Sequence, residues 1–199
     1  MIFSTSVQQL IHALKFLPGI GEKTAQRLTL FLLVREKGKA KILADSITNA
    51  LEAIQYCKKC RILTETEICN ICANLKRTQD VLCVVESPLD VISIEQANCY
   101  SGLYFILMGH LSPIDGINPE DLHIELLLQQ IKDRDIKELI LATNSTVEGE
   151  ATAHYIQQIT AKLNLKITRI AHGIPMGGEL EYIDVGTISR AMQFRLPME

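Results

Sequence analysis

Apolar residues in the first quarter of the chain recur with the period of an α-helix. They occupy positions 7, 10, 11 and 14 as Val7, Leu10, Ile11 and Leu14. This i, i+3, i+4, i+7 spacing predicts an amphipathic helix that ends before Pro18. Further helices are expected over residues 22–34 and 40–54. We therefore expect a small helical unit at the N-terminus, too short to hold a large core alone.

From residue 81 onward the pattern changes to short apolar runs that alternate with helical stretches. The runs at 82–85, 103–107, 139–142 and 167–170 predict strands, and residues 88–97, 120–132 and 149–163 predict helices. Ser87 before Pro88 is a favourable helix start, because a hydroxyl can cap free amides and proline tolerates the first helical position. Strand and helix in alternation predict an α/β domain with a parallel-rich sheet.

The composition of the 199 residues is that of a globular protein. Hydrophobic residues make up 47% and charged residues 22%, which argues against extensive disorder. The first ten residues contain neither a basic segment nor a sustained apolar segment, and no stretch approaches 18 uninterrupted apolar residues. We expect a soluble, cytoplasmic protein without an export signal or a membrane partner.

The formal net charge of −3 conceals a strong segregation of charge along the chain. Residues 1–79 hold 12 Lys/Arg and 6 Asp/Glu, giving +6, whereas residues 80–199 hold 8 and 17, giving −9. A basic N-terminal part favours contact with a polyanion, and an acidic remainder suits protein partners or a metal ion. The alternative is that both surfaces are merely solvated.

Four cysteines form the most specific motif of the chain. Cys57, Cys60, Cys69 and Cys72 have the spacing C-x2-C-x8-C-x2-C, which matches the tetrahedral site of one structural Zn²⁺ ion per chain. Four thiolates fill the coordination shell and leave no position for a catalytic water. In a reducing compartment such pairs favour metal binding over disulfides.

Other residues near this motif have simpler interpretations. Cys83 lies in an apolar run and is expected in the core, and Cys99 is expected in a turn. Lys58, Lys59 and Arg61 could reach phosphate, but exposed basic residues on a small metal-binding knuckle are more often solvated.

Residues 17–28, LPGIGEKTAQRL, join the first two predicted helices by a tight turn. Gly19 and Gly21 permit positive φ and close approach of a ligand, and the amides that open the second helix can face a phosphate. Lys23 and Arg27 are four positions apart and share a helical face. The segment resembles a helix-hairpin-helix motif, which holds the DNA backbone without reading sequence. An ordinary helical hairpin is the alternative, and a P-loop is excluded because the spacing and the preceding strand are absent.

Residues 141–152, LATNSTVEGEAT, follow a predicted strand and resemble the second motif of Toprim domains. The catalytic members carry a D-x-D sequence whose aspartates help to bind Mg²⁺, and these positions are Asn144 and Thr146 here. Three acidic residues remain, Glu86 after the first strand, Glu148 and Glu150. We expect weak or no Mg²⁺ binding, no catalytic residues and a binding module. An equal alternative explains the glutamates as favourable charges at a helix N-terminus.

The order of hairpin, four-cysteine knuckle and Toprim domain without aspartates resembles the RecR family of bacterial recombination mediators. Residues 112–117, SPIDGI, and 173–182, GIPMGGELEY, extend the resemblance over nearly the whole chain. It implies a non-enzymatic repair factor that assembles into rings, typically tetramers, and loads RecA on gapped single-stranded DNA with RecO and RecF. It also implies that Lys23 and Arg27 contact single- and double-stranded DNA inside the ring, without sequence specificity.

The expected organisation is multidomain, combining α+β and α/β parts. Residues 1–55 form the helix-hairpin-helix unit, 56–76 the zinc knuckle, 80–175 the Toprim domain and 176–199 a Gly-rich tail with a helix that contacts other protomers. In this scheme Glu86, Glu148 and Glu150 serve partner docking.

Some positions depart from the commonest pattern of this family, and two other functions compete with it. The departures are Glu22, Phe31, Ser145 and His172. A Mg²⁺-dependent Toprim enzyme acting on DNA phosphodiesters is disfavoured by the missing aspartates. A nucleotide-hydrolysing switch lacks a P-loop, and Gly177 and Gly178 are better explained as a tight turn at a subunit or domain contact.

Overall fold

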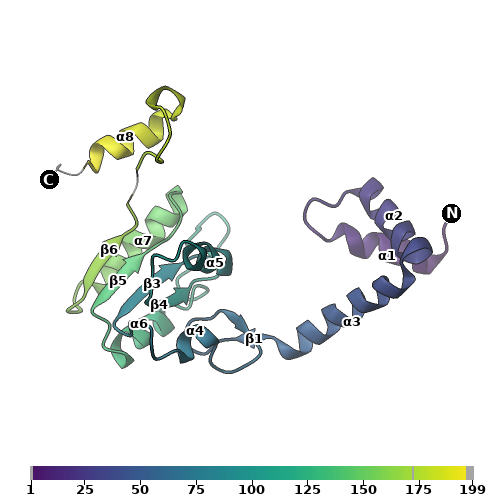
Figure 1. The fold of residues 1–199 in the computed structure, drawn as a ribbon, viewed down its shortest axis with the longest axis horizontal. Coiled ribbons are helices and arrows are strands. Elements are labelled where there is room, and N and C mark those ends of the chain that lie inside the picture. Colours follow the sequence, from purple (N-terminus) through teal and green to yellow (C-terminus); the bar gives the residue numbers. More distant parts are fainter. Residues whose placement is uncertain (1, 172, 196–199) are drawn as a thin grey trace. The chain divides into compact units, whose positions relative to one another are not determined.

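The computed structural model describes residues 2–171 and 173–195, in two compact units that divide after Ile54 (Figure 1). His172 and the last four residues of the predicted tail lie outside the described residues. The first unit contains α1 (Thr5–Lys15), α2 (Glu22–Leu30), the π-helical turn η1 (Phe31–Arg35) and α3 (Lys37–Ala53). The three predicted helices are therefore present, although the second changes to π-helical geometry where it was expected to continue.

The core of the first unit is very small. Of its described residues only Ile11, Ala25 and Thr29 are buried, at the contact of α1 with α2. No residue of the 17-residue helix α3 is buried. Large apolar side chains on α2, η1 and α3 stay exposed: Leu30, Phe31, Leu33, Val34, Ile42, Leu43, Ile47 and Leu51.

The second unit begins with the small knuckle that carries the four cysteines. It consists of the antiparallel pair β1 (Gln55–Tyr56) and β2 (Leu63–Thr64), followed by the short helix α4 (Asn70–Ala73). The sequence pattern did not reveal these short elements, because two-residue strands carry no measurable periodicity.

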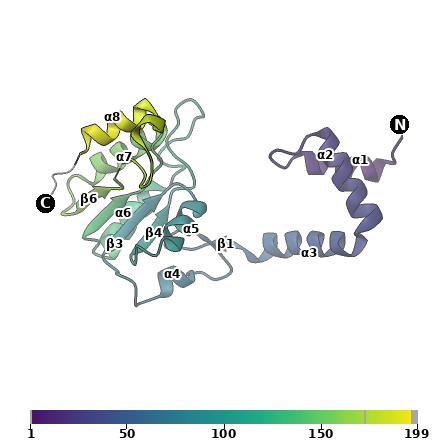
Figure 2. The same ribbon diagram turned by 45° about the horizontal axis from the view of Figure 1, so that its top comes forward.

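A four-stranded, all-parallel sheet follows, as predicted (Figure 2). Its strands lie in the order β4-β3-β5-β6, with bounds Val81–Val85 for β3, Leu103–Ile106 for β4, Glu138–Leu141 for β5 and Lys166–Arg169 for β6. The associated helices are α5 (Pro88–Gln96), α6 (Ile124–Asp133) and α7 (Val147–Thr160). The chain continues through the 3₁₀ turn η2 (Leu180–Tyr182) to α8 (Val185–Gln193).

The two faces of the sheet bury different elements. Alternate residues such as Leu82 and Val84 pack with Leu127 of α6 and Ile156 of α7. The intervening residues, represented by Cys83 and Val85, share a cluster with α5 and with the four knuckle cysteines. The knuckle is thus part of the core of the second unit, and Cys83 is buried as expected.

The order of the strands determines where a site can form. β3 pairs with β4 on one side and with β5 on the other, all in parallel register. Successive connections therefore leave the sheet in opposite directions at the carboxyl ends of β3 and β5, the usual place for ligand sites in such sheets. Glu86 and Asn144 lie at this point. Among the described residues, no helix is long and apolar enough to cross a membrane.

Candidate functional site

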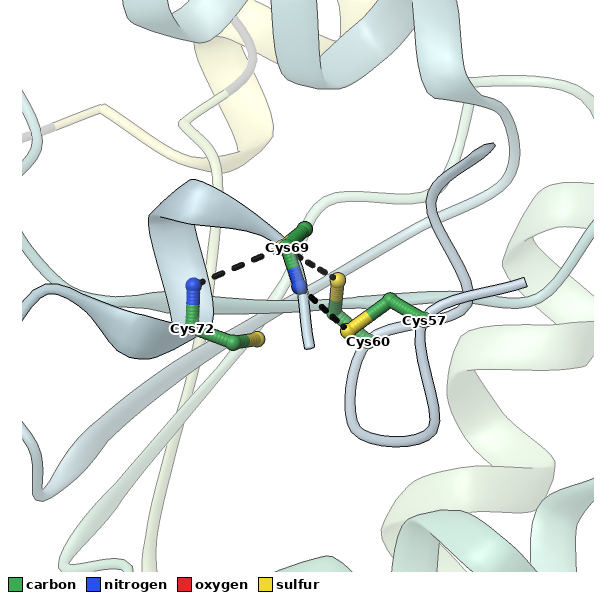
Figure 3. Close-up of side chains that lie close together, drawn as sticks. All are labelled: Cys57, Cys60, Cys69 and Cys72. Atoms are coloured by element: carbon green, nitrogen blue, oxygen red, sulfur yellow. Dashed lines mark hydrogen bonds between the residues drawn. The ribbon is translucent and has the colours of Figure 1, made fainter. Parts of the chain in front are cut away.

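The four cysteines of the knuckle lie close together, Cys57 and Cys60 from the turn between β1 and β2, and Cys69 and Cys72 from the start of α4 (Figure 3). Their sulfur atoms all lie within 4.8 Å of one another, and each residue is at most 5% exposed. The sulfur atoms of Cys60 and Cys69 are 3.5 Å apart. Zn–S bonds of about 2.3 Å place tetrahedral sulfur ligands about 3.8 Å apart, so the cluster fits a zinc ion.

Hydrogen bonds hold the sulfur atoms in this arrangement. The backbone amide of Cys69 donates to Cys57 Sγ at 3.3 Å, and that of Cys72 donates to Cys69 Sγ at 3.4 Å. Hydrogen bonds from Cys60 and Cys72 lower the pKa of Cys69, whereas the hydrogen bond to Cys69 raises the pKa of Cys60. Donation from amides to sulfur favours the thiolate, which is the form that binds zinc.

One basic residue of the knuckle is placed differently from the sequence-based expectation. Arg61 was expected to be exposed, but it is only 7% exposed, and its Nη1 donates to the carbonyls of Ile106, Leu107 and Leu122. Lys58, in contrast, is exposed and pairs with Glu67. The solvated interpretation was therefore wrong for Arg61, because the knuckle packs onto the sheet and carries this side chain inward.

The turn of the helical hairpin has one glycine with positive φ and an uncapped helix start. Gly19 has φ +77°, which a side chain would disfavour, whereas Gly21 has φ −84° and needs no such freedom. Gly21 is the N-cap of α2, and no side chain caps this end, so the first amides of α2 have no hydrogen-bond partner in the part of the chain that the structure describes. Lys23 and Arg27 are both exposed on α2. Of the two glycines that permit positive φ, only Gly19 adopts it.

Glu22 is compensated within the hairpin. Lys15 at the end of α1 donates to Glu22 Oε2, and Gln26 donates to Oε1 at 3.1 Å. The hydrogen bond from Lys15 lowers the pKa of Glu22, so the side chain is a carboxylate at neutral pH. The negative charge beside the proposed phosphate site is consequently balanced by a neighbouring cation.

Glu86 at the end of β3 is buried and fully hydrogen-bonded. It is 5% exposed, and Asn144 donates to it twice, from its backbone nitrogen to Oε1 at 2.8 Å and from Nδ2 to Oε2 at 2.7 Å. His110 Nδ1 lies 3.3 Å from Oε2. Asn144, which stands in place of the first aspartate of the D-x-D sequence, therefore supplies hydrogen bonds to both carboxylate oxygens of Glu86.

Glu150 in the first turn of α7 is paired with two arginines. Its Oε1 accepts from Arg169 Nη2 at 2.9 Å and from Arg190 Nη1 of α8 at 2.7 Å. Burial disfavours its charged form, but the arginines outweigh this effect and lower the pKa of Glu150. The N-cap of α7 is Thr146, whose side chain accepts from the Gly149 amide at 3.1 Å.

We call the carboxyl ends of β3 and β5, with Glu86, Glu148 and Glu150, the acidic edge. Glu148 is half-buried, and its carboxylate has no hydrogen-bond or ion-pair partner among the described residues. In the described part of the chain, the cysteines are the one group of at least three Cys, His, Asp or Glu side chains whose ligand atoms lie close together. The three glutamates share an edge but do not form such a group.

Sequence reasoning did not identify the tertiary partners of Arg61, His110, Arg169 and Arg190. Arg61 directly follows Cys60 in a tight turn and has a φ of +68°. Glycine or asparagine is more usual at a position with such a φ. In principle this position signals a constrained side chain, but nothing in the sequence gives its partners.

Comparison with known proteins places these sites in one family. Four family models match the chain: the RecR helix-hairpin-helix over residues 7–51, the RecR four-cysteine zinc finger domain over 54–74, the Toprim domain over 80–171 and the RecR C-terminal model over 173–195. The chain is also similar to proteins named Recombination protein RecR. That of Hahella chejuensis is 55% identical over 192 residues, or 96% of both chains. That of Coxiella burnetii is 51% identical over 199 residues, covering 100% of this chain and 99% of the relative.

Proposed function

Because the chain belongs to the RecR family of recombination proteins, which act in DNA repair, we propose that it is a non-enzymatic, DNA-binding recombination mediator. It assembles into a ring-like oligomer, a tetramer in our proposal, and acts in the cytoplasm with RecO and RecF to load RecA on gapped single-stranded DNA. The domain limits given above and the roles of the individual site residues belong to the same proposal.

The observation that carries this proposal is the open end of α2. Among the described residues its first amides have no partner, and Lys23 and Arg27 are exposed in the first and second turns of the same helix. A phosphate can accept from these amides and meet both cations, which gives affinity for a nucleic-acid backbone without reading bases. Single and double strands both present phosphates, so both are substrates for this contact.

Ring formation is supported by the apolar surface of the first unit. A groove of about 870 Å³ lies along α2 and η1, lined by Leu28, Phe31 and Val34 together with Arg27 and Arg35. The stripe of Leu43, Ile47 and Leu51 on α3 is also exposed. An apolar surface of this kind around so small a core is typical of an interface, and a second copy of the chain is the occupant we propose.

The zinc ion in this proposal is structural. Cys57, Cys60, Cys69 and Cys72 would hold one ion per chain, and the ion supplies a rigid tetrahedral link between the β1–β2 turn and α4. With four protein ligands the site has no position for a reacting water. The cluster also belongs to a face of the sheet, so the metal stabilises the Toprim core as well as the knuckle.

We propose the acidic edge as the docking site for RecO or RecF. Within it, Glu86 and Glu150 are engaged inside the protein, and Glu148 remains the carboxylate that can meet a basic partner residue. Exposed Val147 lies next to it and can supply an apolar contact.

A charge-reversal experiment tests the DNA contact. Lys23→Glu with Arg27→Glu should weaken binding to single- and double-stranded oligonucleotides by at least about tenfold and lower the slope of log K against log salt by about 2. Lys37→Glu with Lys41→Glu is the matched control, because these lysines are also exposed and four apart, on α3. Unchanged binding and salt dependence in the first variant, with the oligomer intact, would exclude the hairpin as the contact.

A Mg²⁺-dependent Toprim enzyme is the alternative. It requires the carboxylate of Glu86 to bind a metal, whereas both of its oxygens accept hydrogen bonds from Asn144. Nicking, joining or primer synthesis by the pure protein in Mg²⁺ would establish the alternative instead.

A further inference from the structure

Arg61 is a buried cation held by backbone carbonyls. Its Nη1 lies 3.1 Å from the carbonyl oxygen of Ile106, 2.8 Å from that of Leu107 and 3.2 Å from that of Leu122. No acidic side chain in the described ranges forms an ion pair with it. A guanidinium placed in this way compensates its desolvation through hydrogen bonds to carbonyl dipoles.

The backbone of Arg61 is fixed by the knuckle. Arg61 directly follows the metal-ligand candidate Cys60, its amide donates to the Cys57 carbonyl at 2.9 Å, and its φ is +68°. A non-glycine residue with this φ persists when its surroundings hold it. The position of the guanidinium therefore depends on the turn that carries Cys57 and Cys60.

The acceptor carbonyls of Ile106 and Leu107 lie at the end of β4 and in the loop that follows it. The amide of Ile106 also donates to the Cys60 carbonyl at 3.0 Å, so the knuckle contacts this strand end from both its main chain and its side chain. After Leu107 the chain passes through Met108 with φ +63° and Gly109 with φ +152°. We call residues 107–111 the β4 loop.

The β4 loop leads directly to the acidic edge. The Leu107 amide donates to the Val85 carbonyl at 2.9 Å, and the Gly109 amide donates to the Glu86 carbonyl at 3.0 Å. The Leu111 amide donates to Thr152 Oγ1 of α7 at 2.9 Å. His110 lies between Gly109 and Leu111, and its Nδ1 is 3.3 Å from Glu86 Oε2. A shift of the β4 loop would therefore move His110 and the main-chain partner of Glu86 together.

We propose that Arg61 is a positioning residue for the acidic edge, through which the metal-held knuckle fixes the β4 loop and thereby sets His110 against Glu86. Zinc then orders a surface that contains none of its ligands. The coupling is local, because it passes through hydrogen bonds of Arg61 and Cys60 to adjacent residues of one loop. Its relevance to partner docking rests on the function proposed above.

Hydrogen exchange on the full-length, zinc-loaded protein tests the positioning role. In Arg61→Met the amides of Leu107, Gly109 and Leu111 should exchange about tenfold faster or more, as expected when charge-assisted hydrogen bonds are lost. The amide of Ile140 in β5, which pairs with β3 away from this loop, should exchange as before. Lys59→Met is the matched control, because it removes a basic side chain from the same turn.

Two further arms separate positioning from a general loss of stability. Arg61→Lys retains a cation that can reach part of the carbonyl set, so it should restore part of the protection while zinc content stays at one ion per chain. Removing zinc from the wild-type protein with a chelator should accelerate exchange at the same three amides. Unchanged exchange at these amides in Arg61→Met, or equal acceleration across the whole sheet, would overturn the proposal.

A binding measurement keeps this inference distinct from the proposed function. If Arg61→Met loosens the β4 loop and also weakens RecO binding, both proposals gain support. If the loop loosens and both RecO and RecF bind as tightly as to the wild type, the positioning role stands and docking at the acidic edge is wrong.

Discussion

Asn144 donates both its backbone amide and its side-chain amide to the carboxylate of Glu86, at 2.8 and 2.7 Å. One residue therefore satisfies both oxygens of a carboxylate that is 5% exposed. An aspartate at this position would present a second negative charge and lose one of the two donors. Two neighbouring carboxylates, an aspartate at position 144 and Glu86, would need a cation between them. Asn144 and Glu86 form a hydrogen-bonded pair that needs none.

Asn144→Asp is expected to destabilise the second unit. Loss of the side-chain donor and repulsion between two carboxylates should lower the free energy of unfolding by about 1–3 kcal/mol at pH 7. Urea denaturation measures this change, with Asn164→Asp as control because Asn164 is exposed. Millimolar Mg²⁺ should leave the melting temperature of the wild-type protein unchanged. Equal stability of Asn144→Asp and the wild type would show that the Asn144–Glu86 contact contributes nothing.

Gly149→Ala should be strongly unfavourable although glycine lies inside a helix. An added Cβ would lie 2.2 Å from the Asn144 carbonyl oxygen and 2.8 Å from Glu86 Oε1, so the loop before α7 must move. Gly38→Ala on α3 is the matched control, since nothing lies within 4 Å of its Cβ, and alanine there should be neutral or stabilising. Thermal melting compares the two. A Gly149→Ala variant as stable as Gly38→Ala would contradict the close packing.

Cys57→Ser with Cys60→Ser should remove the metal and lower the melting temperature or the yield of oligomer. The binding free energy of a structural zinc ion contributes directly to folding, and these sulfur atoms also belong to the core of the sheet. Cys99→Ser is the control, because Cys99 is exposed and distant from the cluster in sequence. A native protein free of zinc, or full stability of the double variant, would refute a structural zinc ion.

The pair of Arg77 and Glu95 should make stability depend on acid pH. The two hydrogen bonds from Arg77, at 2.9 and 2.6 Å, hold the pKa of Glu95 below its usual value. A carboxyl whose folded pKa is lowered contributes stability above its unfolded pKa of about 4.3, and the contribution disappears as the pH falls through the folded pKa.

Glu95→Gln should consequently destabilise the protein at about pH 6 and less at about pH 3.5, which lies below the unfolded pKa, measured as the difference in urea midpoint from the wild type. Any loss of zinc in acid affects both proteins and cancels in this difference. Glu125→Gln, at an exposed position of α6, is the control. A midpoint difference that is the same at both pH values would rule out the ionic contribution of Glu95.

Leu51→Glu should reduce the mass of the oligomer in solution. Leu51 is 80% exposed on α3, and a charge there opposes burial in an interface between protomers. Asn49→Glu introduces the same side chain on the same helix, outside the apolar stripe of Leu43, Ile47 and Leu51, and should leave the mass unchanged. Light scattering at several protein concentrations distinguishes them. An unchanged mass in Leu51→Glu would place the interface elsewhere.

Periodicity and motif spacing predicted most of the fold. Capping at the Ser87–Pro88 helix start is confirmed by reciprocal hydrogen bonds between Ser87 and Asp90. The expected tight turn in the tail is also present, with Gly177 at φ +83° and the Gly178 amide donating to the Pro175 carbonyl at 3.2 Å. Such features depend on residues close in sequence, which is why a sequence pattern can reveal them.

The electrostatic state of the acidic edge was not predictable in the same way. Glu150 and its partner Arg190 are 40 positions apart, and Arg61 reaches carbonyls 45, 46 and 61 positions away. These contacts form because the knuckle and α8 pack against other parts of the second unit. The motif alone therefore identifies which glutamates remain but not which of them are already engaged.

If protomers associate through the first unit as proposed, its small core links its folded shape to the amount of protein present. Three buried side chains, Ile11, Ala25 and Thr29, are few to offset the conformational entropy of its helices, whereas a second copy can cover the exposed apolar surface. Folding of the hairpin and association of protomers then become one equilibrium, governed by mass action. Lys23 and Arg27 would then be held on one helical face only when enough protein is present for association. Dilution would unfold this helix before it unfolds the Toprim sheet.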